Sequence, residues 1–223
     1  MTPRLRVLDI FSGTGSITKA FRAATHEVDS LDIDPRFEPT ICTNVLDWNY
    51  KALPRGYYDV IWASCPCENY SIARSSALTP RDLMLADSLV LRTQEILTWF
   101  SPRCWFIDNP AGSMLWRRFK FPHLVTTSYC SYGFRYKKAT TIATNLVDFS
   151  LKDPCGGAGV CASMVGKQHK EHAQKGGGGV EDVYHSRDEL HRIPHGLCLD
   201  VVLFCGSFIG ARSNGSVGEL TEV

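Results

Sequence analysis

Short apolar runs alternate with amphipathic stretches along the first 110 residues of the chain. Short runs bounded by Gly, Pro, Asp or Ser are typical of buried strands, and apolar positions repeating every three to four residues are typical of helices. The pattern predicts strands over residues 6–11, 28–33, 58–63, 104–107 and 139–143. It predicts helices over residues 16–23 and after Thr79-Pro80, with Leu83, Ala86, Val90, Thr93 and Leu97 at helical spacing. This alternation indicates an α/β fold with a doubly wound, mostly parallel sheet.

The second half of the chain has a less regular pattern. Residues 153–182 hold Gly156-Gly157, two cysteines, two close histidines and the glycine run 176–179, and they predict a loop or an insertion. Residues 190–204 are apolar enough for a closing helix, and residues 206–223, which contain Gly and Ser, predict a flexible tail.

Composition adds limits to this picture. The chain has 223 residues, 24 Lys+Arg against 23 Asp+Glu, 44% apolar residues and 9 Cys, as expected of one soluble domain that is not a polybasic binder. Its apolar runs fall short of the roughly 20 residues of a membrane span, and its start lacks a secretory signal pattern. Irregularly spaced cysteines then predict reduced thiols in an intracellular compartment, the cytoplasm or the nucleus.

The first turn predicts a nucleoside site. Gly13 and Gly15 follow the first predicted strand directly, and glycines let the backbone approach a ligand closely. The second predicted strand ends at Asp32, where a carboxylate in such a sheet accepts hydrogen bonds from ribose hydroxyls. Asp47 could accept from an adenine amino group; an ordinary glycine turn with surface acids is the alternative.

Two reactive groups are expected at the same edge of the sheet. Cys67 follows the strand YDVIWA, and a thiolate there is a strong nucleophile when its pKa is lowered. Asp108 follows the strand CWFI, where a carboxylic acid could donate a proton if burial raises its pKa. Cys65 could be a packing thiol, and Asp108 could be a helix cap or a turn residue.

These motifs, in this order, resemble those of the DNA cytosine-5 methyltransferase family, and in particular its compact phage- or virus-encoded members. They are Phe11-Ser12-Gly13-Thr14-Gly15, the acidic end of the second strand, Pro66-Cys67 with Tyr70-Ser71, and Asp108-Asn109-Pro110. The resemblance covers about residues 5–145 and implies a single methyltransferase domain over residues 1–223.

By this resemblance the cofactor is S-adenosylmethionine. The resemblance implies contacts from the Gly13 to Ser16 backbone, from Asp32 to the ribose, from Phe11 and Ile33 to adenine, and from Asp47 to the adenine amino group. The implied cofactor site is therefore Phe11, Gly13, Thr14, Gly15, Ser16, Asp32, Ile33, Asp47 and Pro66.

The resemblance also implies a mechanism. Cys67 attacks carbon 6 of cytosine, Asp108 protonates ring nitrogen 3, and carbon 5 takes the methyl group before the thiol is eliminated. Because a stacked base cannot react in this way, the DNA partner is a duplex with a flipped cytosine or a single strand.

The chain departs from the family pattern at two positions. The family has Glu where this chain has Asp108, which is shorter by one methylene, so the proton donor could sit about 1 Å too far away. The family also has a Gln-x-Arg-x-Arg element near residues 133–138, and here only basic residues remain. Among them, Arg135 is predicted to contact the flipped base or its phosphates and is the third catalytic candidate.

A basic stretch without acidic residues runs from residue 117 to residue 138 and is interleaved with aromatic residues. Such a stretch suits a phosphate backbone with stacking platforms, although a solvated face around a β-hairpin is the alternative. The predicted nucleic-acid contacts are Arg117, Arg118, Lys120, Lys137 and Lys138.

Cys155, Cys161, His169 and His172 could together bind zinc, since two thiolates and two imidazoles complete a tetrahedron. Their spacings lie outside the usual finger ranges, so a flexible glycine-rich loop is the alternative.

Residues 146–190 are all that remains where family members have a much larger target-recognition domain. The sequence therefore predicts either minimal sequence discrimination or a protein partner that supplies it. An RNA (tRNA) cytosine-5 methyltransferase and a catalytically weakened nucleic-acid-binding protein remain as alternatives.

Overall fold

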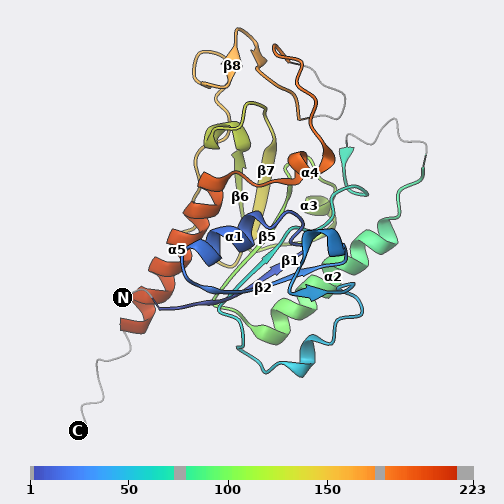
Figure 1. The fold of residues 1–223 in the computed structure, drawn as a ribbon, viewed down its shortest axis with the longest axis vertical. Helices are drawn as coiled ribbons and strands as arrows, with labels where there is room; N and C mark the ends of the chain where they lie inside the picture. Colours follow the sequence, from blue (N-terminus) through green and yellow to red (C-terminus); the bar gives the residue numbers. More distant parts are fainter. Residues whose placement is uncertain (1–2, 73–78, 174–178, 215–223) are drawn as a thin grey trace.

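A computed structural model describes residues 3–72, 79–173 and 179–214. Its centre is a seven-stranded sheet in the order β3-β2-β1-β4-β5-β7-β6 (Figure 1). The strands are β1 (Arg6–Ile10), β2 (Glu27–Asp32), β3 (Ile41–Cys42), β4 (Val60–Ala63), β5 (Cys104–Pro110), β6 (His123–Ser128) and β7 (Ala139–Thr144). The first five are parallel, and β7 runs antiparallel to both β5 and β6.

Helices cover both faces of this sheet because successive side chains of a buried strand point to opposite faces. Val7 of β1 belongs to a core with α1 (Ser16–Ala23) and α5 (His195–Asn214). Leu8, the next residue, belongs to a second core with α2 (Leu83–Phe100). Figure 1 shows α1 and α5 together, with α2 on the other side of the sheet. The predicted doubly wound, mostly parallel sheet is confirmed.

The predicted elements differ from the observed ones mainly at their ends. The helix over residues 16–23 and the core of each predicted strand are present, whereas β3 and β6 were not predicted. The predicted helix start at Thr79-Pro80 is wrong, because α2 begins at Leu83 and its N-cap Asp82 accepts from Leu85 N at 2.9 Å. Strand β5 continues to Pro110, so Asp108 lies within a strand, paired with Ile142 of β7.

The predicted closing helix over residues 190–204 is two helices, because Pro194 interrupts it. Helix α4 (Arg187–His191) ends before this proline, since Pro has no N–H and disfavours helical backbone at the preceding residue. Helix α5 then continues to Asn214, so residues 206–214 are helical and not a tail. The rest of the predicted tail, residues 215–223, lies outside the described residues.

Residues 187–211 are long and apolar enough to cross a membrane by length and composition alone. Several of the apolar side chains in this segment are nevertheless used inside the protein. Leu197, Cys198, Val201, Cys205 and Ile209 are buried in the core shared with α1. Packing therefore accounts for these five side chains, whereas Leu199 and Leu203 of the same helix are exposed.

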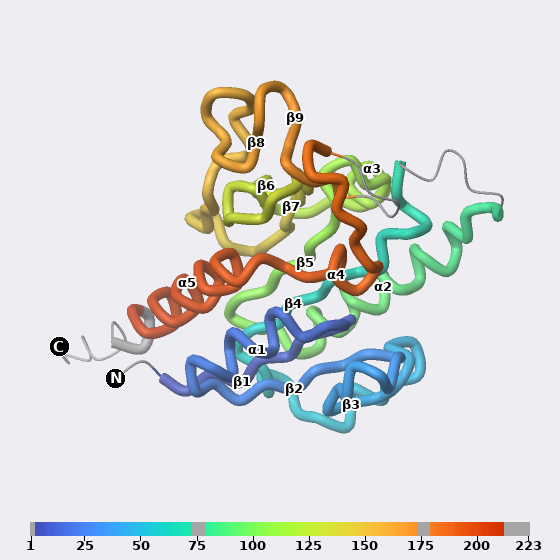
Figure 2. The backbone as a smooth tube through the Cα atoms, turned by 45° about the horizontal axis from the view of Figure 1, so that its top comes forward, coloured from blue at the N-terminus to red at the C-terminus, as the bar shows by residue number. Residues whose placement is uncertain are grey.

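The predicted insertion contains a small hairpin, β8 (Met164–Val165) and β9 (Gln168–His169). Figures 1 and 2 both show this segment beside β6 and β7, at the end of the molecule away from β2 and β3. The short helix η4 (Tyr129–Tyr132) connects β6 toward β7 beneath it. Residues 174–178, which include the first three residues of the glycine run 176–179, lie outside the described residues.

Candidate active site

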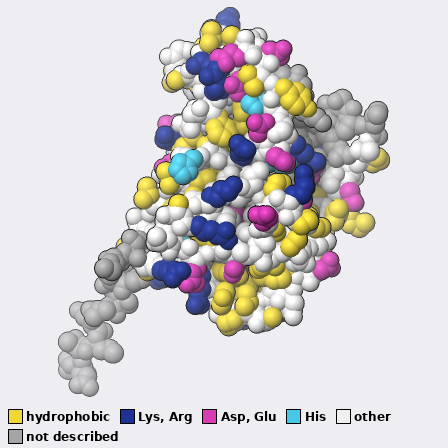
Figure 3. All heavy atoms as spheres, in the orientation of Figure 1, with side chains coloured by type: hydrophobic (Ala, Val, Ile, Leu, Met, Phe, Trp, Pro, Cys, Tyr) yellow, Lys and Arg dark blue, Asp and Glu magenta, His cyan; other side chains and the backbone are white. Residues whose placement is uncertain are grey.

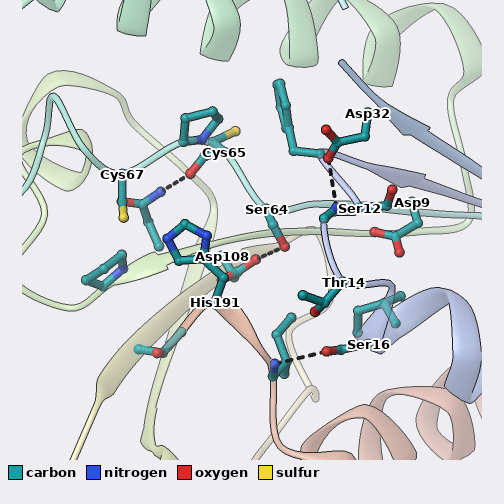
Figure 4. A pocket seen from close by; sticks show the side chains of 18 of the residues that line it. Asp9, Ser12, Thr14, Ser16, Asp32, Ser64, Cys65, Cys67, Asp108 and His191 are labelled. Atoms are coloured by element: carbon teal, nitrogen blue, oxygen red, sulfur yellow. Dashed lines mark hydrogen bonds between the residues drawn. The ribbon is translucent and has the colours of Figure 1, made fainter. Parts of the chain in front are cut away.

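A pocket of about 250 Å³ opens at the carboxyl ends of β1, β2, β4 and β5. The strand order reverses direction between β1 and β4, and ligands bind at such a switch point in doubly wound sheets. Figure 4 shows Asp9, Ser12 and Asp32 at one end of the pocket and Cys67 at the other, with Ser64 and Asp108 between them. Residues from the turn after β1, the loop after β4 and the end of β5 therefore share one cavity.

The turn after β1 forms the first end of the pocket. Gly13 and Gly15 have φ values of 46° and 72°, in the left-handed region that glycine adopts without steric cost. Gly13 N donates to Asp32 Oδ2 at 2.8 Å, and Gly15 caps the start of α1 without a side-chain hydrogen bond. The resulting backbone exposes amide groups at a helix N-terminus, where anions and polar ligands bind.

Asp32 connects this turn to the end of β2. Its carboxylate also accepts from Asp34 N at 2.9 Å, and it is 9% exposed. A carboxylate has about four acceptor positions, so it retains capacity for ligand hydroxyls. Ile33 and Phe37 continue the pocket wall beside it. Phe37 was missed because it is the last residue of a short 3-10 helix, η1 (Pro35–Phe37), that the apolar pattern does not reveal.

Most of the predicted cofactor residues line this pocket. Among the described residues, Phe11, Gly13, Thr14, Ser16, Asp32, Ile33 and Pro66 do so. Gly15 lies within the same turn but does not line the cavity itself. Asp47 is exposed, its backbone N–H bonds to Asn44 O, and it does not line the pocket.

The loop after β4 brings Cys67 into the pocket. Asn109 of β5 donates from Nδ2 to the Cys65 carbonyl at 2.7 Å and is itself 1% exposed. Ser64 N donates to Ile10 O at 3.0 Å, which fixes the start of the loop against β1. Both cysteines line the cavity, but Cys65 is buried with its Sγ 3.9 Å from Thr93 Oγ1 of α2, whereas Cys67 is partly exposed. The expected division between a packing thiol and an accessible thiol agrees with this placement.

Asp108 is held by a short chain of hydrogen bonds. Trp62 Nε1 donates to Ser64 Oγ at 2.9 Å, and Ser64 Oγ donates to Asp108 Oδ1 at 2.6 Å. Burial raises the pKa of Asp108, while the Ser64 hydrogen bond and the Lys138 charge oppose the rise. A raised pKa brings this carboxyl group closer to the protonated state that a proton donor needs.

Lys138 lies in this pocket and not on an outer surface. Its Nζ donates to the Leu190 carbonyl at 2.7 Å. Burial lowers the pKa of Lys138, and the charges of Asp108 and Cys67 counteract that effect. Burial raises the pKa of Cys67, and the Lys138 charge is the largest effect that lowers it. A thiol, an acid and an ammonium group therefore influence one another within one cavity.

His191, the last residue of α4, and Ile193, between α4 and α5, complete the pocket. Ile193 N donates to Ser16 Oγ at 3.1 Å, which joins this segment to the start of α1. Near the pocket mouth, Arg187 also forms an ion pair with Glu68. None of these positions carried a sequence signal, because their partners lie far away along the chain.

Arg135 does not line the pocket. Its guanidinium lies 2.6 Å from Glu171 Oε1 and also pairs with Glu181. These partners belong to the predicted insertion, so Arg135 joins the insertion to the segment between β6 and β7. The geometry gives it a structural position in place of the expected contact with a base.

The predicted basic stretch does not form one continuous basic surface. Arg118 of α3 (Leu115–Arg118) is paired with Asp87, while Arg117, Lys120 and Lys137 are exposed. Figure 3 shows basic and acidic side chains interleaved across the face in view. The stretch includes strand β6, so the predicted β-hairpin alternative matches its local structure.

The predicted metal ligands are corrected in one position. Cys155, Cys161 and His169 lie together, and Cys130 of η4 is their fourth neighbour. The ligand atoms that all lie within 4.8 Å of one another belong to Cys130, Cys155, Cys161 and His169, and His172 is not a member of this group. Cys130 was missed because it lies 25 residues before Cys155, on the other side of β7.

The fold and the site together indicate the class of protein. A glycine turn and an acidic strand end at the switch point, with a nucleophile and an acid at adjacent strand ends, are the features of an S-adenosylmethionine-dependent methyltransferase. No protein-family model matches the chain. It is similar to a "Probable DNA (cytosine-5)-methyltransferase" of Frog virus 3 (isolate Goorha), with 30% identity over 226 residues, 90% of this chain and 100% of the relative. The chain belongs to the DNA cytosine-5 methyltransferase family.

Two solved structures were also compared. The first, an S. pombe Dnmt2 methyltransferase, has 18% identity and a TM-score of 0.47 over 66% of this chain and 54% of its own. The second is an E. coli prophage-encoded protein described as a DNA modification methyltransferase. It has 15% identity and a TM-score of 0.48 over 63% of this chain and 46% of its own. This chain thus spans about half the length of each.

Proposed function

We propose that the protein transfers a methyl group from S-adenosylmethionine to carbon 5 of cytosine in DNA. The observation that carries this proposal is the shared cavity, which has the Gly13–Asp32 turn at one end and Cys67 with Asp108 at the other. A nucleoside-like cofactor and a second, reacting base can therefore meet in one place. The viral relative that covers 90% of the chain supports the same activity.

The residues at the first end fit the cofactor. Asp32 is buried, faces the cavity and keeps acceptor capacity beyond its two backbone donors, as ribose hydroxyls require. Phe11, Ile33 and Phe37 offer apolar contacts for an adenine ring. Asp47, which does not line the cavity, has no part in this proposal. When bound, S-adenosylmethionine supplies an electrophilic methyl group.

The residues at the second end carry the chemistry on cytosine. The Cys67 thiolate forms a bond to carbon 6 with its own electron pair, and the π pair of the carbon 5–carbon 6 double bond moves through the ring as nitrogen 3 takes a proton from Asp108. Carbon 5 thereby becomes nucleophilic and accepts the methyl group. Nitrogen 3 gives its proton back to the Asp108 carboxylate as carbon 5 takes the methyl group. Solvent water then accepts the carbon 5 proton, and the freed electron pair restores the carbon 5–carbon 6 double bond and expels the Cys67 thiolate. Lys138 favours the thiolate, because its positive charge lowers the pKa of Cys67 against the effect of burial.

The cavity requires an unstacked base, so the target is a flipped or single-stranded cytosine. The exposed side chains of Arg117, Lys120 and Lys137 are candidate phosphate contacts. Because residues 146–190 are short for a target-recognition domain, the proposal includes limited sequence discrimination or a protein partner. All nine cysteines are unpaired, which supports a reducing, intracellular setting.

The experiment is covalent trapping on DNA that contains 5-fluorocytosine, which blocks loss of the carbon 5 substituent. Wild-type protein with S-adenosylmethionine should form a complex that survives denaturation, and Cys67→Ser should not. Cys42→Ser is the matched control, since Cys42 is exposed on β3 and outside the pocket. Failure of the wild-type protein to form the complex at any salt concentration would overturn the proposal.

Two further comparisons separate the alternatives. Methyl incorporation into duplex DNA, single-stranded DNA and tRNA should be highest for a DNA substrate; a preference for tRNA would indicate an RNA methyltransferase. If wild-type protein binds S-adenosylmethionine without transfer and Asp108→Glu does not restore it, the protein is a nucleic-acid-binding protein that retains only the cofactor pocket.

A further inference from the structure

The strongest feature outside the active site is a group of three thiols and one imidazole. Cys130, Cys155, Cys161 and His169 present Sγ and nitrogen atoms that all lie within 4.8 Å of one another. They come from three places in the chain: η4, the loop of residues 153–163 and strand β9. The fold, not local sequence, therefore brings them together.

The distances within this group fit a tetrahedral metal ion. Zn–S bonds of about 2.3 Å and Zn–N bonds of about 2.0–2.1 Å at a tetrahedral angle place sulfur and nitrogen about 3.5–3.6 Å apart. Cys155 Sγ and Cys161 Sγ lie 3.5 Å and 3.6 Å from His169 Nε2. A neutral imidazole nitrogen has one lone pair and cannot accept from both thiols, whereas a central cation satisfies all of the ligands at once.

The backbone around the group has a second feature of structural metal sites. Gly157 and Gly159 both have φ values of 83°, which turn the chain sharply between Cys155 and Cys161. The Gly157 backbone makes a hydrogen bond to the Cys155 thiol, an outer contact that stabilises a thiolate ligand. Cys155 N is itself held by Ser128 Oγ at 3.1 Å.

The surrounding charge also suits a cation with three thiolates. Such a centre has a net charge of about −1, since zinc contributes two positive charges. Lys137 lies close enough for its charge to act on both Cys155 and His169. Its positive charge opposes the net negative charge of such a centre.

We infer that Cys130, Cys155, Cys161 and His169 bind one structural zinc ion. Soft thiolate ligands with one imidazole select Zn²⁺ over hard cations, and four protein ligands leave no open position for catalysis. The ion fastens the insertion to η4, whose first residue, Tyr129, lines the active-site pocket. The Tyr129 N–H donates to the Lys138 carbonyl at 3.0 Å, so the fastened segment includes the pocket lysine.

The test measures metal in the full chain after expression in zinc-supplemented medium and removal of loose metal by dialysis. Elemental analysis should give about one equivalent of zinc per chain, and Cys130→Ser should fall well below it. His172→Ala should retain the zinc, because His172 lies outside the group. Cys42→Ser is the matched control for loss of a cysteine elsewhere.

Wild-type protein provides a readout that does not depend on a variant's folding. Cobalt substitution should give the absorption of a tetrahedral thiolate centre, and a chelator should release the metal together with newly reactive thiols. Wild-type protein with little zinc would overturn the inference, as would retention by Cys130→Ser with loss from His172→Ala. A deficit of two reactive thiols in the denatured, untreated chain would indicate a disulfide and would also overturn it.

Discussion

Asp9 provides a stability test of the buried charge at the active site. It lies on β1, is 1% exposed, and accepts from Thr18 N at 3.0 Å and Thr18 Oγ1 at 2.6 Å. Burial raises the pKa of Asp9 from 3.8 to about 7, the Thr18 hydrogen bonds oppose that rise, and the charges of Asp108 and Asp32 add to it. The perturbation is Asp9→Asn, which keeps an acceptor for Thr18 and removes the titration.

The magnitude follows from linkage between protonation and folding. The folded protein holds the Asp9 proton up to about pH 7, whereas the unfolded chain releases it near pH 3.8. The contribution of Asp9 to the free energy of unfolding is therefore fully present below pH 3.8 and is lost as the pH rises to about 7. A difference of roughly 3 pKa units corresponds to about 4 kcal/mol, an upper bound for the order of magnitude.

The assay is urea unfolding of wild type and Asp9→Asn at several pH values from 5 to 8, followed by tryptophan fluorescence. The unfolding free energy of the variant minus that of wild type should increase by roughly 2–3 kcal/mol as the pH rises from 5 to 8. At pH 5 folded Asp9 is still protonated, so both proteins offer Thr18 a neutral acceptor, and the difference between them should be smallest at this end of the range.

Asp34→Asn is the matched control. Hydrogen bonds from Arg36 lower the pKa of Asp34, so its titration lies below the range tested and its difference from wild type should be flat. A flat difference for Asp9→Asn as well, or one that falls with rising pH, would refute the reasoning about buried charge.

Three other changes test the pocket and its surroundings. Lys138→Met should shift the rise of kcat/KM to higher pH, because the ammonium group lowers the pKa of Cys67; Lys138→Arg should shift it less, and identical profiles would contradict this role. Asn109→Ala should cost roughly 1–3 kcal/mol in urea unfolding by leaving the buried Cys65 carbonyl without its donor, and unchanged stability would show that another donor replaces it. Arg135→Ala should leave kcat/KM within about twofold and stability within about 1 kcal/mol, since its ion pairs are half-exposed and outside the pocket. A tenfold loss of activity would restore Arg135 as a base contact.

Much of the fold could be predicted because its signals are local. Helix α1 was predicted with its observed ends, since the glycine turn before it and the amphipathic period within it are adjacent in sequence. Other boundaries depended on neighbours in space. Strand β5 extends through Asp108 and Asn109 because β7 pairs with those positions, and no property of the segment alone reveals this partner.

The sequence by itself determined the parallel sheet, the nucleoside turn and the positions of Cys67 and Asp108, because strand ends in a doubly wound sheet meet at one edge. Tertiary structure decided which other residues join them. It brought Lys138 and His191 into the pocket, paired Arg135 with Glu171, and replaced His172 with Cys130 in the metal group. The physical reason is that these contacts join segments from different parts of the chain, as in the bond between Ser16 and Ile193, which are 177 residues apart.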